Sequence, residues 1–466
     1  MTAPRLLFLT PEPPSATGGG LAMRSGSTLR ALAGAGWDVH VLVVPVHGER
    51  SGDGGSTVAR FAAAYGTLDL DRLAPGSTRQ AALDTLGDPD LRRSLGATSP
   101  RPGPCRRLGA GAVRAVTDLA LGAPPAVGDR FDALHVLRLY LAPVLDALLA
   151  RPDRPVITVD VDEDDATVAR ELDALAGGGG DLTLPGHQDL GAGPGDAVGA
   201  GDAGEADVGG DAPAYERLQR WYLPRVDRVA VASAGEARRL EERCGLPSGS
   251  IVVVPNEVPL RCSSPGTEAP GPGGHPAVGC GPAPVVTDLL LVGNFSWPPN
   301  ADAAMVLCDR VRPALADTLG RPATVALVGK DPPPAVLRLG GTAGVRVTGY
   351  VDDVGPYYAA AGVAAVPMRA GGGSRIKLLE AMDLGVPVVT TDAGAAGLDA
   401  ISQPPVEVVG SVAGFAGACR TALVDPAWRD RRIRDARRWV HDHHGPVPVA
   451  GAMNQLVAPP ERGGTR

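Results

Sequence analysis

The chain has 466 residues, long enough for two or three ordinary domains that each bury a hydrophobic core. A formal net charge of −8 and an aromatic content of 4% argue against a nucleic-acid partner, which needs cations for the phosphates and rings for the bases. The 6 cysteines lack metal-ligand spacing, and no run approaches the ~20 apolar residues of a membrane span. We therefore expect a cytoplasmic protein, either free or in peripheral contact with the inner face of the membrane.

The N-terminal half begins with a pattern typical of a parallel α/β domain. A strand at 5–10 (RLLFLT) leads into a Gly-rich loop at 11–20 and a helix at about 21–33, and the next strand is expected at 38–44. Alternation of strands and helices predicts a parallel sheet that is covered on both faces. Further strands of this domain are expected at 133–136, 156–161, 229–232 and 251–254, with a helix at 215–222.

A second start of the same kind follows at 287–292 (TDLLLV), with a loop at 293–300 and a helix at about 301–314. It continues with strands at 324–328, 344–347, 363–367 and 386–391, and with helices at 375–384 and 428–441. The sequence therefore predicts an N-terminal domain over 1–260, a second domain over 285–425, a C-terminal helix over 426–445 and a tail over 446–466.

Two segments have few bulky apolar residues and cannot bury enough surface to order themselves. Residues 177–212 are rich in Gly and Asp, and we interpret them as an expanded surface loop of the first domain. Residues 261–284 are rich in Pro and Gly and are interpreted as the linker between the domains. The arginines between residues 92 and 107 are either a solvated face or a cationic patch for an anionic acceptor or lipid head groups.

The most informative stretch is 367–397, PMRAGGGSRIKLLEAMDLGVPVVTTDAGAAG. Its glycine run lets backbone N–H groups approach a ligand closely. Ser374 is expected to cap the following helix and Gly385 to end it. The start of this helix then opens at the carboxyl edge of a parallel sheet, where free N–H groups and the helix dipole attract anions.

Arg375 and Lys377 lie in the first turn of this helix, where acidic residues are usually preferred. We interpret the two cations as partners of an anion bound at the helix start. Glu380 lies one turn further on the same face and can accept hydrogen bonds from a vicinal diol such as a ribose. The alternative is an ordinary capped helix with a surface pair between Lys377 and Glu380.

The segment GGGSRIKLLEAMDLGVPVVTTDAGAAGLDA resembles the donor site of family 4 glycosyltransferases, the retaining "group 1" enzymes, in their G-x-R-x-K-x-x-E-A-M branch. The segments TGYVDDVGPYYAAAGVAAVPM, VVVPNEV and TPEPPSATGGG are similar to other parts of that family. The resemblance implies an α/β protein of the GT-B fold, in which two doubly wound Rossmann-like domains face a central cleft. It also implies that the last helix crosses back to the N-terminal domain.

The resemblance assigns roles to particular residues. Glu380 matches the second Glu of the family's E-x7-E motif, which binds the donor ribose, whereas Gly372 stands where the first Glu usually contacts the sugar. Backbone amides then take over part of the sugar recognition, and Arg375 and Lys377 replace an Arg/Lys pair that is missing from the loop GNFSWPPNADA. The expected donor-binding residues are Glu380, Gly371, Gly372, Gly373, Ser374, Asn294 and Lys330.

The function implied is transfer of a sugar from a nucleoside-diphosphate donor to a small-molecule, glycan or lipid-linked acceptor, with retention. The departing phosphate accumulates charge that cations and amides stabilise, and in such enzymes it also helps to deprotonate the acceptor. We expect a nucleotide sugar as co-substrate, without a cofactor and without a metal ion. The expected catalytic residues are Arg375, Lys377 and His135. The alternatives are a non-catalytic nucleotide-sugar-binding protein and a GT-B epimerase.

Candidates in the N-terminal domain are weaker. Gly18, Gly19 and Gly20 precede a helix that carries Arg24, and the interpretations are a cleft-facing loop near the phosphates or the acceptor, or an ordinary flexible turn. His135 resembles a strand-end histidine that faces the cleft, but a core histidine fits as well, and Arg138 shares that turn.

An acidic cluster follows the strand at 156–161. It fits either an acidic helix N-terminus or a metal site of the D-x-D kind, and it consists of Asp160, Asp162, Glu163, Asp164 and Asp165. His441, His443 and His444 are expected to be cations at the C-terminus of their helix.

Overall fold

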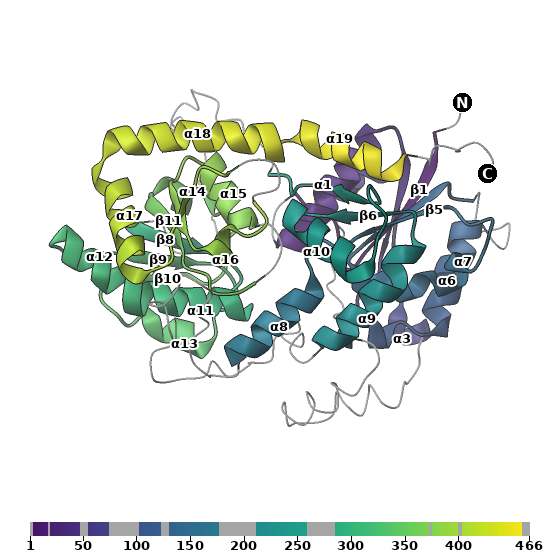
Figure 1. Cartoon of the computed structure of the whole chain (residues 1–466), viewed down its shortest axis with the longest axis horizontal. Helices are drawn as coiled ribbons and strands as arrows, with labels where there is room; N and C mark the ends of the chain where they lie inside the picture. Colours follow the sequence, from purple (N-terminus) through teal and green to yellow (C-terminus); the bar gives the residue numbers. More distant parts are fainter. Residues whose placement is uncertain are drawn as a thin grey trace, which may run out of the picture.

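The computed structural model contains two α/β domains side by side, which confirms the expected two-domain architecture (Figure 1). It describes residues 3–16, 19–46, 55–73, 102–122, 130–176, 211–258, 285–371, 375–398 and 403–458. Most of the two low-complexity segments therefore lies outside the described residues. The last residue of the first one, however, belongs to a helix that begins at Ala212.

The N-terminal domain is built on a seven-stranded parallel sheet in the order β3-β2-β1-β4-β5-β6-β7. Its strands are β1 (Arg5–Thr10), β2 (Asp38–Val43), β3 (Ala64–Thr67), β4 (Ala133–Leu137), β5 (Val156–Asp160), β6 (Arg228–Val231) and β7 (Ile251–Val253).

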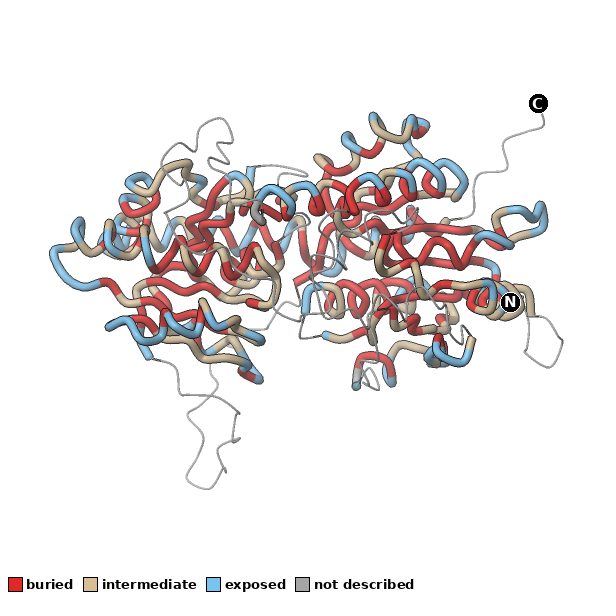
Figure 2. Tube along the Cα trace, turned by 90° about the horizontal axis from the view of Figure 1, so that it is seen from below, coloured by how far each residue is buried: buried red, intermediate tan, exposed pale blue. Residues whose placement is uncertain are grey.

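Both faces of this sheet are covered by helices, as the apolar strands predicted. Side chains alternate along a strand, so Leu7 and Leu9 of β1 enter one core while Leu6 and Phe8 enter the other. Figure 2 shows this buried interior in each domain, with exposed residues mainly at the periphery. The helical elements of the domain are α1 (Gly20–Gly34), α2 (Gly55–Phe61), α3 (Leu70–Leu73), η1 (Gly103–Arg107), α6 (Ala110–Leu121), η3 (Leu139–Leu145), α7 (Asp146–Leu149), α8 (Asp165–Ala176), α9 (Ala212–Tyr222), η4 (Leu223–Arg225) and α10 (Ala234–Cys244).

The C-terminal domain repeats this plan with a six-stranded parallel sheet in the order β10-β9-β8-β11-β12-β13. Its strands are β8 (Thr287–Val292), β9 (Val325–Val328), β10 (Val345–Val347), β11 (Ala361–Val366), β12 (Val388–Thr390) and β13 (Glu407–Val408). Its helices are α11 (Pro298–Val306), the π-helical turn η5 (Leu307–Val311), α12 (Arg312–Leu319), α13 (Pro334–Leu339), α14 (Gly355–Ala359), α15 (Ile376–Asp383), α16 (Asp392–Ala395) and α17 (Val412–Val424).

Two C-terminal helices run from the second domain back to the first (Figure 1). Helix α18 (Pro426–His444) buries Trp439 and Val440 in the core of the C-terminal domain. The following helix α19 (Pro446–Val457) buries Val449 and Met453 against the N-terminal sheet. The expectation of a tail from residue 446 is therefore wrong up to Val457, because the apolar residues of this segment complete the N-terminal core.

The end of α18 is fastened to the segment that leaves β7. The backbone N–H of Val258 donates to the His444 carbonyl at 3.2 Å, and His444 Nδ1 donates to the Asn256 carbonyl at 2.8 Å. Burial lowers the pKa of His444 to about 4. His444 is therefore neutral at physiological pH, and its expected role as a cation at the helix end is wrong.

The arginine-rich stretch is described only in part. Arg106 pairs with Asp211 at 3.6 Å and Arg107 with Asp71 at 2.5 Å, while the arginines at 92, 93 and 101 lie outside the described residues. The two described arginines therefore hold N-terminal elements together.

Candidate active site

The helix singled out in the sequence, α15, starts at the carboxyl edge of the C-terminal sheet, after strand β11. It ends as predicted, because Gly385 has φ +77° and the Val386 N–H donates to the Ala381 carbonyl at 2.8 Å. Its start differs from the prediction. Arg375 rather than Ser374 occupies the N-cap position, with a non-helical ψ of 88°.

Lys377 lies in the first turn of α15 and points at the loop after β8. Its ammonium donates to Asn300 Oδ1 and lies 4.0 Å from Met368 Sδ. A methyl group added at Gly293 would come within 3.4 Å of Nζ, so this loop approaches the amine closely. Burial, helped by the charge of Arg375 and opposed by Glu380, lowers the pKa of Lys377 to about 7.

Arg375 is buried and lies where the two domains meet. Its guanidinium donates to the Gly371 carbonyl and to the Ala393 carbonyl, the latter at 3.3 Å. Burial lowers the pKa of Arg375, and carboxylates of the N-terminal domain oppose that effect. Those carboxylates are Glu163, Glu171 and Glu236. The role of Arg375 at an anion site stays a prediction, and the structure gives it carboxylate neighbours from across the domain junction.

Glu380 is half-buried one turn after Lys377, on the same side of α15, as the spacing predicted. The Asn294 side chain forms hydrogen bonds within its own loop. Its Oδ1 accepts from the N–H of Ser296 at 3.1 Å and from the Ser296 hydroxyl at 2.8 Å. Lys330 follows β9 at the same edge, and its carbonyl accepts from the Phe295 N–H at 3.0 Å. This edge of the sheet therefore gathers Lys377, Glu380 and the loop that contains Asn294.

Arg24 does not face an acceptor, contrary to the prediction. It is 2% exposed and donates to both carboxylate oxygens of Asp160 at 2.9 Å. It also donates to the Val254 carbonyl at 3.1 Å and to Asn256 Oδ1 at 2.7 Å. All of these partners lie at the ends of β5 and β7, so Arg24 neutralises a buried carboxylate and joins α1 to the sheet.

His135 is also corrected by the structure. It lies inside β4 with 0% exposure, its Nδ1 is 2.8 Å from Thr158 Oγ1, and its ring stacks on Phe8 with centroids 5.5 Å apart. Burial lowers its pKa to about 4, so the ring is neutral near pH 7. The core interpretation holds in this conformation, because the ring does not reach the surface between the domains.

The acidic cluster lies at the start of α8, and its carboxylates pair with arginines. Arg138 donates to Glu163 at 3.1 Å and to Asp165 at 2.6 Å, so it binds the cluster rather than open solvent. Asp164 accepts from Arg243 at 2.7 Å. Arg138 and Asp162 both have positive φ, 78° and 61°, although neither is glycine. Strained backbone of this kind concentrates at functional sites.

The glycine loop of the N-terminal domain is described in part. Gly19 is the N-cap of α1, and a methyl group at Gly20 would lie 3.4 Å from Ile376 Cδ1 at the start of α15. Gly20 therefore lies beside the start of α15, and the role of this loop in binding stays a prediction. Gly18, Gly372, Gly373 and Ser374 lie outside the described residues.

Sequence reasoning missed several residues that position the site. Asn300 holds the Lys377 ammonium, the Tyr358 hydroxyl donates to the Lys377 carbonyl at 3.1 Å, and Arg369 pairs with Asp302 beside the glycine run. Asn300 ends the expected loop GNFSWPPN and Arg369 lies two residues before the first glycine, so both gave a weak signal. Glu171, which accepts from the Gly371 N–H at 2.6 Å, gave none.

Two family models match the chain. Residues 19–257 match a glycosyl transferase 4-like domain, and residues 286–425 match glycosyl transferases group 1. A search of the curated proteins finds no match.

Solved structures show the same two-domain fold. The chain is similar to sucrose-phosphate synthase from Thermosynechococcus elongatus, with 16% identity, a TM-score of 0.58 and coverage of 97% of this chain and 98% of that one. It is similar to a glycosyltransferase from Rickettsia africae, with 10% identity, a TM-score of 0.57 and coverage of 99% and 100%. It is also similar to HepE from Anabaena, solved with UDP and glucose, with 12% identity, a TM-score of 0.54 and coverage of 97% and 99%.

The fold and the matched models together define a glycosyltransferase of the GT-B type, with two Rossmann-like domains. The chain belongs to the glycosyltransferases with a glycosyl transferase 4-like N-terminal domain, and its C-terminal domain matches glycosyl transferases group 1. No helix in the described part of the chain is both long and apolar enough to cross a membrane. Among the described residues, no three His, Cys, Asp or Glu side chains gather so as to hold a metal ion.

Proposed function

We propose that this protein transfers a sugar from a nucleoside-diphosphate donor to a hydroxyl-bearing acceptor, with retention of anomeric configuration. The observation that carries the proposal is the start of α15, where Arg375 and Lys377 lie at the carboxyl edge of a parallel sheet and next to the other domain. Oriented N–H groups, a guanidinium and an ammonium favour a diphosphate there. The Anabaena relative solved with UDP-glucose supports this class of donor.

In the proposed arrangement Lys377 and Arg375 contact the diphosphate, and Glu380 accepts hydrogen bonds from the ribose. Lys377 has a pKa of about 7 in the empty protein, and an adjacent phosphate stabilises its charged form. The backbone amides from Gly371 onward are then left for the distal phosphate and the sugar.

Departure of the nucleoside diphosphate develops negative charge on the distal phosphate while the sugar becomes oxocarbenium-like. The two cations stabilise that charge where it develops, because they are already in place before the reaction. In a retaining reaction the departing phosphate oxygen accepts the acceptor's proton on the same face of the sugar, so no separate carboxylate base is needed. Closure of the two domains over the donor excludes the water that would otherwise hydrolyse it.

The test begins with a thermal-shift screen of UDP-, GDP-, ADP- and dTDP-sugars. The donor that stabilises the protein is then incubated with candidate acceptors, and released nucleoside diphosphate is measured. We expect Lys377→Ala to lower the transfer rate by roughly 10²–10³-fold. Arg338→Ala, which removes an exposed cation in the same domain, is expected to transfer at the wild-type rate.

Several results would contradict the proposal. A rate for Lys377→Ala within a few-fold of the wild type removes the cation from the mechanism. Donor binding without any release of nucleoside diphosphate indicates a binding protein, and conversion of the donor without acceptor indicates an epimerase. Inversion at the anomeric carbon, read by NMR of the product, contradicts retention.

A further inference from the structure

Helix α8 packs in the N-terminal domain, and its direction in Figure 1 is toward the C-terminal domain. Glu171, in the middle of this helix, accepts a hydrogen bond from the backbone N–H of Gly371 at 2.6 Å. These two residues are 200 positions apart in sequence, and the bond joins the two domains directly at the glycine run.

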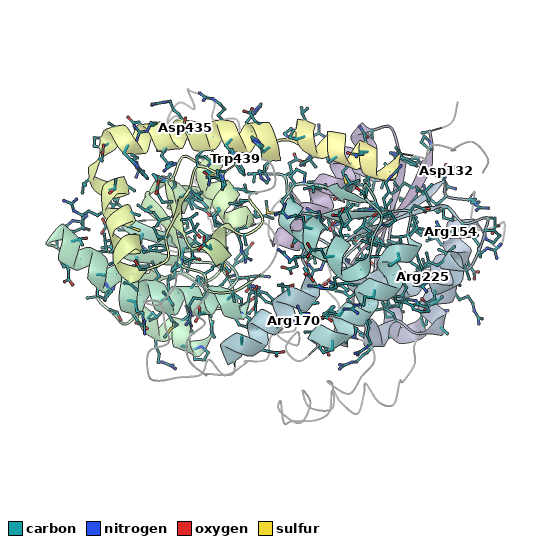
Figure 3. All side chains as sticks on the ribbon, in the orientation of Figure 1. Asp132, Arg154, Arg170, Arg225, Asp435 and Trp439 are labelled. Carbon is teal, nitrogen blue, oxygen red and sulfur yellow. The ribbon has the colours of Figure 1, made fainter. Side chains whose placement is uncertain are left out.

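The neighbouring residues of α8 show that this contact is specific. Arg170, labelled on α8 in Figure 3, forms an ion pair with Glu216 of the N-terminal domain, and Leu172 is 7% exposed. Glu171, between them, bonds instead to the C-terminal domain.

Two neighbouring groups stabilise the negative charge of the Glu171 carboxylate. It accepts from a backbone amide, and the guanidinium of Arg375 is close enough for the two charges to interact. Gly371 has φ +118°, and a methyl group there would lie 2.9 Å from Arg375 Nη2, so the backbone and the guanidinium approach closely. Hydrogen bonds between an amide and an ionised carboxylate are stronger than neutral ones.

The same amide and guanidinium are groups to which the proposed function assigns the donor diphosphate. A carboxylate and a phosphate within a few ångströms of each other repel strongly where burial limits the screening by water. Glu171 and the diphosphate therefore cannot occupy this position together.

We propose that Glu171 is an internal competitor of the donor. In the empty protein its carboxylate occupies the anion position at Gly371 and holds the two domains together, and the diphosphate must displace it. This inference rests on the proposed diphosphate site. It adds a residue of the N-terminal domain that sets the affinity for the donor.

The first experiment measures the affinity of inorganic pyrophosphate by titration calorimetry. Glu171→Gln keeps the size of the side chain but removes its charge, so we expect pyrophosphate to bind about tenfold more tightly than to the wild type. Asp173→Asn removes the same charge from an exposed position on the same helix, and its affinity should match the wild type. Unchanged or weaker binding by Glu171→Gln overturns the proposal, as does the absence of binding to both proteins.

The second experiment measures the radius of gyration of the ligand-free protein by X-ray scattering. We expect Glu171→Ala to have a larger value than the wild type and Asp173→Asn to have the same value, because only the first loses the contact between the domains. Equal radii for all three proteins contradict the closing contact. A thermal unfolding curve with the wild-type midpoint shows that each variant is folded.

Both readouts are independent of turnover. A protein without transferase activity can still show the competition, and an active transferase can lack it. Failure of this inference and failure of the proposed function are therefore distinguishable.

Discussion

Lys377 is one of two lysines in a chain whose 44 basic residues are otherwise all arginines. Both lysines follow strands of the C-terminal sheet at its carboxyl edge. An arginine stays protonated when it is buried, whereas a lysine changes its charge readily. The lysine at 377 therefore makes the charge of the proposed anion site sensitive to its surroundings, and with a pKa of about 7 it is partly protonated near neutral pH.

The lowered pKa predicts selective chemistry at this amine. Because acylating reagents attack only the neutral amine, we expect acetic anhydride at pH 7 to modify Lys377 rapidly, with its rate following a pKa of about 7. Peptide mapping by mass spectrometry measures the rate. The Lys330→Ala variant should retain the fast site and the Lys377→Ala variant should lose it. A rate at Lys377 that still rises steeply above pH 9 contradicts the assignment.

A second prediction concerns the pH dependence of anion binding. Lys377 is cationic below its pKa of about 7, so above that pH pyrophosphate binding must take up a proton. The affinity of the wild type, relative to Lys377→Arg, should therefore fall by up to about tenfold per pH unit between pH 7 and 9. The ionisation of pyrophosphate itself cancels in this ratio, which is measured by calorimetry. A ratio that is constant with pH would rule out Lys377 as the titrating group.

The sequence revealed those residues of the candidate site that are unusual for their place in a helix. It missed the residues whose partners are far away in the sequence. Arg375 and Lys377 stood out because cations are unusual at a helix start. Glu171 lies in an ordinary amphipathic helix, and nothing local distinguishes it from its neighbours. Arg24 was misassigned for the same reason, because its partner Asp160 is 136 residues away and only the folded sheet brings them together.

At the scale of single elements, α15 shows how a helix end can depend on one residue. Gly385 has φ +77°, a conformation that costs other residues about 1–2 kcal/mol. A methyl group there would also lie 2.6 Å from Arg437 Nη2 of α18. The glycine therefore ends α15 and lets α18 approach at the same point.

We expect Gly385→Ala to lower the free energy of unfolding by at least about 1–2 kcal/mol, which a denaturant or thermal titration measures. Gly417→Ala is the matched control, since this glycine lies within α17 with nothing within 4 Å of an added methyl group. That change should leave the stability equal or raise it by about 0.5–1 kcal/mol. Equal effects of the two substitutions would contradict the account of the helix end.

Most regular elements were predictable, because strands buried on both faces are continuous apolar runs with recognisable loops between them. Strand β3 was missed because it is an edge strand of sequence AYGT, mostly exposed and without apolar alternation. Helix α19 was missed because Pro446, Pro448 and Gly451 are typical of a tail. Prolines are tolerated in a first turn, however, and packing on the N-terminal sheet supplies the rest of its stability.

At the scale of the whole molecule, the N-terminal domain depends on the last helix of the chain. Helix α19 buries Val449, Met453, Leu456 and Val457 in the core it shares with β1 and α1. At about 1.5–3 kcal/mol for each side chain, their burial contributes roughly 6–12 kcal/mol as an upper estimate. That amount is comparable to the stability of a typical domain.

Deletion of residues 446–466 should therefore unfold the N-terminal domain or lower its melting temperature strongly, as followed by calorimetry and by binding of a hydrophobic dye. Deletion of residues 459–466 alone leaves α19 intact and should keep the wild-type melting temperature. A shorter chain that melts like the full-length protein would show that α19 is dispensable.

The pairing of His444 with Asn256 and Val258 has a mechanical consequence. The chain passes between the two domains twice, and these hydrogen bonds fasten the two passages to each other at one spot. This point permits rotation but resists sliding, so we expect the domains to rotate about it once the contact between Glu171 and Gly371 is broken. Helix α8, which carries Glu171, lies on the side away from α18 in Figure 1, where a small rotation at the hinge produces the largest displacement.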